Sequence, residues 1–200
     1  MTGATETPTG ITAVSTVQYV SDGVIFAAVQ FDGATNPDGT PVYLPVTVTD
    51  DESGPDAWML ARIKSLYSIT VPEFILEAAR QKKRAEINAW RDVQENGSVI
   101  FTLNGHRWDC GKASQTRLSP VVAVAKSGML PPGFFWTDAD NIDVPMTTDE
   151  LTALEAAMQQ NMVLQGFKIH ERQRQMKEEV DKLTDYKAIK DYAVGWPEGS

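Results

Sequence analysis

The chain has 200 residues and a mass of 22.0 kDa, with 42% hydrophobic and 22% charged residues. This length and composition are typical of one folded domain or two small ones, and they exclude collagen-like, disulfide-scaffold and wholly disordered classes. A single cysteine cannot form an intrachain disulfide. The net charge of −9 disfavours a nucleic-acid partner, because tracking phosphates requires a concentrated basic surface.

The sequence contains no hydrophobic run that approaches the ~18 residues of a membrane helix, so we expect no membrane insertion. Residues 1–10 lack the basic and hydrophobic regions of a secretion signal, and we expect synthesis in the cytoplasm. These residues are rich in threonine and have little to bury. We therefore expect them to be ordered only by contact with something else.

Short strands separated by turn residues are predicted in the N-terminal third, at 14–20, 24–31 and 42–48. Hydrophobic residues alternate along the third strand, and Pro45 removes a hydrogen-bond donor from it, which places this strand at a sheet edge. An exposed edge can pair with a strand of a partner. A short helix is predicted at 57–65, and we expect 1–70 to form a β-rich docking module.

The helix predicted next, at 71–95, has hydrophobic residues near both ends and a basic stretch, 80–84, in its middle. A helix with this pattern often bridges two packed bodies, so we expect a bridging helix. The charge distribution also indicates two modules, because residues 1–70 carry eight acidic and two basic side chains whereas the rest carry nineteen and sixteen. The basic stretch could contact nucleic acid, but a solvated helix surface fits the acidic total better.

Residues 96–200 are predicted to form a C-terminal α+β domain. Asn104-Gly105 lies between two alternating runs, which is a strong signal for a β-hairpin over 99–110. Thr147 and Glu150 have the spacing of a capping box that opens a helix. We expect helices at 113–126, 147–164, 167–183 and 186–193, the second of them ending at Gly166. The predicted fold is therefore α+β: a small N-terminal antiparallel β unit, a bridging helix, and one hairpin packed on three or four helices.

Residues 138–143 form the one acidic cluster that resembles a loop for a hard cation, with Asp138, Asp140 and Asp143. Paired carboxylates of this kind could serve a glycosidase or bind a hard cation. The EF-hand pattern fails, however, because its sixth position is Asp143 rather than glycine and its twelfth is Asp149 rather than glutamate. We expect a turn in which Asx side chains cap backbone amides.

The reactive residue types are few: His106, Cys110 and His170. A cysteine–histidine pair could form in space, but no local motif supports one, and the spacing does not fit a zinc site. No dinucleotide-binding, phosphate-binding or nucleophile-elbow motif occurs. We therefore assign no catalytic, cofactor-binding or metal-binding residue, and we expect no enzymatic activity and no cofactor.

Four separated blocks carry a resemblance to a known family: Arg84–Arg91, Phe101–Trp108, Phe135–Asn141 and Gly166–Lys177. Together, over residues 83–196, they resemble a domain of unknown function found at the C-terminal end of tailed-bacteriophage tail proteins, including tail fibre and tail fibre assembly proteins. That family has no assigned catalytic residues to transfer. The N-terminal 70 residues lie outside the resemblance.

The resemblance implies a structural component of a bacteriophage tail, at the baseplate or where a fibre attaches, located in the virion. Its expected partners are other tail, fibre or baseplate proteins, and we expect a homo-oligomer in the assembly. The alternative is a tail fibre assembly chaperone that is absent from the mature virion.

Overall fold

The computed structural model describes residues 10–197 and 199, so the N-terminal segment expected to be ordered by something else lies outside the described residues. The fold is α+β, as predicted, with a β-sheet near the N-terminus and a C-terminal helical region that carries a small hairpin. Contacts divide the chain into two compact units. Of the described residues, the first unit comprises 10–83 together with Leu183–Tyr192, and the second comprises Arg84–Lys182 together with 193–197 and 199.

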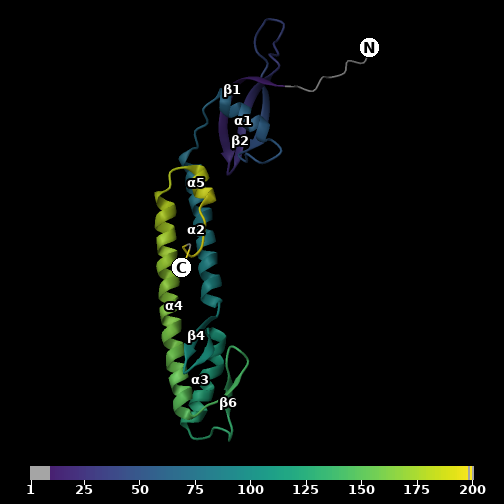
Figure 1. Cartoon of the computed structure of the whole chain (residues 1–200). Helices are drawn as coiled ribbons and strands as arrows, with labels where there is room; N and C mark the ends of the chain where they lie inside the picture. Colours follow the sequence, from purple (N-terminus) through teal and green to yellow (C-terminus); the bar gives the residue numbers. More distant parts are fainter. Residues whose placement is uncertain (1–9, 198, 200) are drawn as a thin grey trace, which may run out of the picture. The chain divides into compact units, whose positions relative to one another are not determined.

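The first unit contains an antiparallel sheet in the order β1-β2-β3 (Figure 1). Its strands are β1 (Ile11–Ser21), β2 (Val24–Phe31) and β3 (Leu44–Thr49). β1 and β2 meet at a tight turn in which Gly23 has a φ of 70°, a conformation that suits glycine. The prediction that the third strand lies at an edge is confirmed, since β3 pairs only with β2 within the described residues.

The core of the first unit forms on one face of this sheet. Alternate residues of β2, Ile25, Ala27 and Val29, are fully buried there. Helix α1 (Ala57–Leu66) contacts β1 and β3 and adds its buried Leu60 and Ile63. Since one short helix covers only part of a sheet face, further hydrophobic side chains must complete the core.

Helix α5 (Tyr186–Asp191) completes that core with Tyr186 and Ile189. The sequence-based division assigned this helix to a C-terminal domain over 96–200, whereas the structure places it with the N-terminal sheet. The physical reason is that the exposed hydrophobic face of the sheet needs a cover that residues 1–70 do not supply in full. The compact units therefore do not follow the predicted boundaries.

Helix α2 (Glu73–Asn96) is continuous, as predicted, and the division between the units falls within it, after Lys83. Its basic middle is paired with acids. The Arg80 guanidinium lies 2.8 Å from Glu73, and that of Arg84 lies 2.6 Å from Asp181. Much of the positive charge of this stretch is thus neutralised within the chain.

The second unit begins with the predicted hairpin, β4 (Val99–Leu103) and β5 (His106–Cys110). Asn104 and Gly105 both have positive φ, 52° and 79°, as a two-residue hairpin turn requires. The hairpin packs with helix α3 (Lys112–Lys126), which contains Pro120, and with helix α4 (Thr148–Lys182). The chain between α3 and α4 forms the short strands β6 (Phe135–Thr137) and β7 (Asp143–Pro145), which pair with each other.

The predicted capping box at the start of α4 is confirmed. The backbone amide of Thr147 donates to the Glu150 carboxylate at 2.8 Å, and the amide of Glu150 donates to the Thr147 hydroxyl at 3.3 Å. The prediction that this helix ends at Gly166 and that another begins at Phe167 is wrong, because α4 runs without interruption for 35 residues. A single glycine lowers helix stability by only about 1 kcal/mol, and packing of the residues around it outweighs that cost.

The core of the second unit is built from the hairpin, α3 and α4. Farther along α4, buried Ile169 and Met176 continue the packed face, and the Gln173 side chain donates to the Asn88 side chain of α2 at 2.9 Å. A polar pair of this kind within a helix seam fixes how the two helices align. None of the helices in the described part of the chain combines the length and hydropathy that crossing a membrane requires.

Gly166 provides a test of the continuity of α4. A Cβ atom at this position would meet nothing within 4 Å, so Gly166→Ala is expected to raise the free energy of unfolding by about 0.5–1 kcal/mol. Gly111→Ala is the matched control, because its Cβ atom would lie 3.1 Å from the Gly97 carbonyl oxygen and should destabilise the fold. Urea unfolding monitored by circular dichroism measures both. A destabilising Gly166→Ala would contradict an open, regular helix at this position.

Candidate functional site

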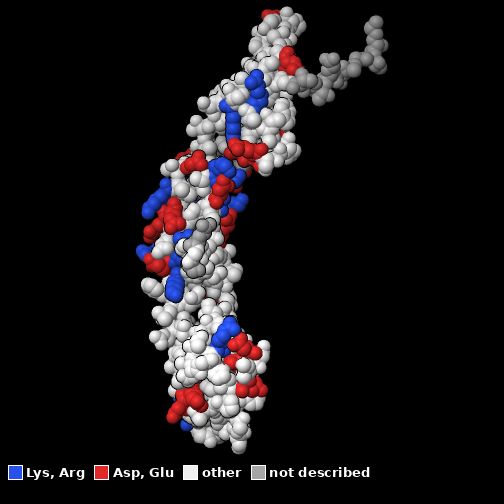
Figure 2. Space-filling model, viewed as in Figure 1, with Lys and Arg blue, Asp and Glu red and all other residues white. Residues whose placement is uncertain are grey.

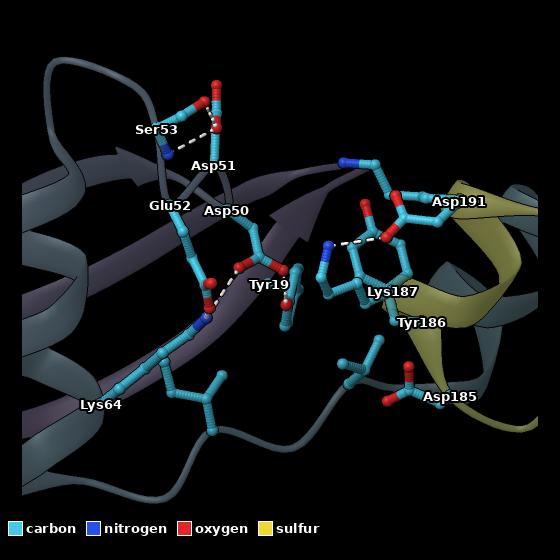
Figure 3. Close-up of a pocket in the computed structure, with 13 residues that line it drawn as sticks. Tyr19, Asp50, Asp51, Glu52, Ser53, Lys64, Asp185, Tyr186, Lys187 and Asp191 are labelled. Carbon is cyan, nitrogen blue, oxygen red and sulfur yellow. Dashed lines mark hydrogen bonds and ion pairs between the residues drawn. The ribbon is translucent and has the colours of Figure 1, made fainter.

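A cavity of about 630 Å³ in the first unit lies between the sheet and α5 (Figure 3). Four parts of the unit line it: β1 through Tyr19, the loop 50–53 after β3, α1 through Lys64, and α5. Figure 3 shows that side chains from the loop and from α5 face each other across this cavity. This cavity is the candidate functional site of the first unit.

Two buried tyrosines form its floor. The rings of Tyr19 and Tyr186 pack edge to face, with centroids 5.6 Å apart and an interplanar angle of 67°. The Tyr19 hydroxyl donates to the Asp50 carboxylate, and the Tyr186 hydroxyl donates to the Asp22 carboxylate. Each phenol thus buries its ring and satisfies its polar end with an acid from another element.

Burial and, after it, these carboxylates keep the phenols protonated. Burial first, and then the hydrogen bond and charge of Asp50, raise the pKa of Tyr19 above its usual value. Burial first, and then Asp22, raise the pKa of Tyr186 in the same way. Both hydroxyls are therefore hydrogen-bond donors at neutral pH rather than nucleophiles or bases.

The lysines around the cavity are engaged as well. Lys64 Nζ lies 3.1 Å from Asp50 and 3.2 Å from Glu52. Partial burial alone would lower the pKa of Lys64, but the hydrogen bonds and charges of these acids raise it. On α5, Lys187 pairs with Asp191 at 2.6 Å, and Lys190 Nζ lies 5.2 Å from the centre of the Tyr186 ring.

The sequence around α5 positions this helix. Asp185 caps it by accepting a hydrogen bond from the Ala188 amide at 2.8 Å, which is a favoured role for aspartate at a helix N-terminus. The chain just before α5 is held by Arg80, whose guanidinium donates to the Leu183 carbonyl oxygen at 3.1 Å. The cap and this contact set where Tyr186 enters the core.

The chemistry of this site favours holding the chain over transforming a substrate. Its phenols donate to carboxylates, and Lys64 and Lys187 are paired with acids. Ile69 and Val71 are the aliphatic residues in the described lining, whereas small-molecule pockets are lined mainly by hydrophobic side chains. We therefore interpret the cavity as the polar margin of a joint between α5 and the sheet.

The structure places the acidic cluster of 138–143 in a turn, as predicted. The Asp138 side chain is 1% exposed and accepts from the backbone amides of Asp140 and Ile142, both at 2.9 Å. The Ile142 amide and, after it, His106 hold the pKa of Asp138 below its usual 3.8, although burial opposes them. The other two aspartates have separate partners, since Asp140 pairs with Arg107 and Asp143 accepts from Thr137.

The histidines and the cysteine are not brought together. His106 Nδ1 lies 3.0 Å from Asp138, and His170 Nε2 lies 3.0 Å from Glu95. Cys110 is buried, its sulfur donates to the Met158 carbonyl oxygen at 3.4 Å, and burial raises the pKa of its thiol. Among the residues that the structure describes, no group of three or more His, Cys, Asp or Glu side chains could hold a metal ion.

Sequence reasoning missed the tyrosine pair. Asp22 and Tyr186 are 164 positions apart, and no short motif links them. The available signals were local ones: Asp185 at a favoured cap position and a hydrophobic pair, Tyr186 and Ile189, at helical spacing. These signals predict a short helix, but not the surface that it covers.

The fold and this site define an α+β protein in which a polar cavity lies where α5 joins the N-terminal sheet. Residues 78–194 match the family described as a domain of unknown function, DUF4376. The match covers more than half of the chain, and the protein belongs to this family. It begins within α2 and includes α5, whereas the strands of the N-terminal sheet precede it. Neither a curated protein nor a solved structure matches the chain.

The joint can be tested at Tyr186. Tyr186→Phe removes the donor to Asp22 and should destabilise the first unit by about 1 kcal/mol, while Tyr186→Ala also empties the core and should cost about 3–5 kcal/mol. Hydrogen exchange of the β1–β3 amides measures the stability of the first unit separately from that of the second unit. Tyr43→Phe is the control, since the Tyr43 hydroxyl makes no hydrogen bond within the described residues. Unchanged protection of β1–β3 in Tyr186→Ala would contradict the joint.

The Asp138 carboxylate predicts that the free energy of unfolding depends on pH. Its lowered pKa means that the ionised form stabilises the fold above the unfolded-state value near 3.8, and that this contribution is lost as pH falls through the folded-state pKa. Asp138→Asn should therefore destabilise the second unit at pH 7, and the difference from the unsubstituted chain should shrink below pH 3.8. Chemical unfolding of the two chains at pH 7 and at a pH below 3.8 measures this difference. Asp143→Asn, at the exposed first position of β7, is the control.

Proposed function

We propose that the protein is a structural component of a bacteriophage tail, at the baseplate or at a fibre attachment point, and that it acts through protein–protein contacts. The observation that carries this proposal is the set of four blocks within 84–177 that resemble the C-terminal domain of tail proteins. Membership of the DUF4376 family over residues 78–194 is consistent with it. In this proposal the protein is made in the host cytoplasm and resides in the virion.

The absence of reactive geometry in the candidate site supports a role in contact rather than catalysis. The phenols and the lysines Lys64 and Lys187 hold chain segments together, and the described histidines each bind one carboxylate. A protein that works by docking needs rigid units and accessible surfaces rather than reagents. Both compact units have hydrophobic cores of their own.

The edge of β3 is the proposed docking surface of the first unit. β3 pairs with β2 in an unbroken register from Leu44 to Thr49. The other edge strand, β1, has three register shifts against β2, and irregularities of this kind hinder pairing with a further strand. A strand of a tail protein would therefore add to the sheet at β3.

The alternative is a tail fibre assembly chaperone that leaves before the virion matures. The same sequence blocks favour it, because the resemblance includes tail fibre assembly proteins. Mass spectrometry of purified virions separates the two roles. A structural component is expected at constant stoichiometry to the other tail proteins, whereas a chaperone is found only in infected-cell lysate. Absence from particles would overturn the structural role.

Docking through β3 has its own test. Thr47 and Thr49 are exposed on β3, and lysines at both positions should oppose strand addition and weaken binding to the tail protein about tenfold or more. The matched control places lysines at exposed Ser15 and Thr16 on β1. Co-purification of the tagged variants with virion proteins measures retention. Equal retention by both variants would contradict docking at β3.

A further inference from the structure

The outward side of α4 carries a stripe that no described element covers. The residues of this stripe are exposed and recur at alternating spacings of four and three positions. They are Asp149, Ala153, Ala156, Gln160, Val163 and Phe167. The core-facing side of the same helix carries Leu151, Leu154, Met158 and Ile169. Alternating four- and three-residue spacing is the pattern of a coiled-coil seam.

This stripe is unusually hydrophobic for an exposed helix surface. Val163 is 73% exposed and Phe167 is 69% exposed, and the adjacent Leu164 is 53% exposed. No charged residue occurs from residue 156 to residue 167. Figure 2 shows the same contrast, with charged side chains gathered over the C-terminal half of α4 and an uncharged surface over its middle. Such a surface marks an interaction site.

We propose that two copies of the chain associate through this stripe, with their α4 helices antiparallel. The proposed contact surface consists of the uncharged residues of the stripe and the adjacent Leu164, and we call it the α4 strip. Its residues are Ala153, Ala156, Gln160, Val163, Leu164 and Phe167. The inference lies within the second unit and does not depend on a role in a phage tail.

Side-chain size favours the antiparallel direction. The small residues of the α4 strip, Ala153 and Ala156, lie toward its N-terminal end, and the large ones, Val163 and Phe167, lie toward its C-terminal end. In an antiparallel pair centred between residues 161 and 162, Phe167 of one copy lies opposite Ala156 of the other. Large against small fills the seam, whereas a parallel pair would set alanine against alanine and leave a gap.

Charge favours the same alignment. Opposite Asp149 of one copy lies Arg174 of the other, and opposite Glu155 lies Lys168. Asp149, Glu155 and Lys168 form no ion pair among the described residues, so they are available to a second copy. Arg174 also lies 2.7 Å from Glu171 and 3.7 Å from Glu178 of its own helix, so Asp149 of the second copy would join an existing ion-pair group. A parallel pair would instead bring each charge beside its own kind.

The first test measures how the oligomeric state of the full chain depends on its concentration. Sedimentation velocity is expected to show a dimer that dissociates on dilution, because a single helix pair is a small interface. Phe167→Glu should weaken dimerisation at least tenfold. Val93→Glu is the matched control, since Val93 is 68% exposed on α2 of the same unit and should leave the dimer unchanged. Circular dichroism checks that both variants remain folded.

The second test is the direction of the helices. In the proposed dimer, Ala153→Cys in one copy lies opposite His170→Cys in the other, so oxidising a mixture of the two variants should give a mixed disulfide-linked dimer. Neither variant alone should crosslink, because identical positions are then about 25 Å apart. The native Cys110 is buried and does not compete.

Three results would overturn the proposal. One is a monomer at all concentrations, and another is a dimer that Phe167→Glu leaves intact. Crosslinking of Ala153→Cys with itself would show parallel helices. If the chain is monomeric and Phe167→Glu instead abolishes binding to a tail protein, the α4 strip contacts a different protein. That last outcome rejects the dimer while supporting the proposed tail function.

Discussion

The packing of Tyr186 against Tyr19 is the contact on which the first unit depends. It joins two segments that lie near opposite ends of the chain, and each hydroxyl is satisfied by an acid, Asp50 or Asp22. Without α5, the described cover of the hydrophobic face formed by β2 would be reduced to α1, the first turns of α2 and the connection between them, with Ile69 and Val71. The covering helix thus comes from the part of the chain that follows α4.

The N-terminal sheet and the family domain share a hydrophobic core. The DUF4376 match ends at residue 194 and includes α5, so residues of the family domain contribute to the core of a sheet whose strands precede the match. Because a sequence-defined family and a folding unit are different things, their boundaries here do not coincide.

The two proposed contact surfaces belong to different units and have different physical bases. The β3 edge offers backbone hydrogen bonds, with specificity left to the side chains of the partner. The α4 strip offers hydrophobic side chains in a spacing that another helix can match. Two surfaces of such different kinds would let a protein contact two partners by independent means, which is the arrangement that we propose.

The sequence by itself determined the elements whose signals are local. Asn104-Gly105 predicted its hairpin because both residues tolerate positive φ, and Thr147 with Glu150 predicted the start of α4 because their side chains cap each other's amides. Only the tertiary structure decided that α4 continues through Gly166 and that Tyr186 meets Tyr19. Helix continuation depends on the sum of packing along the helix, and the meeting of two distant segments depends on which hydrophobic surfaces remain uncovered. Neither quantity can be read from the neighbouring residues alone.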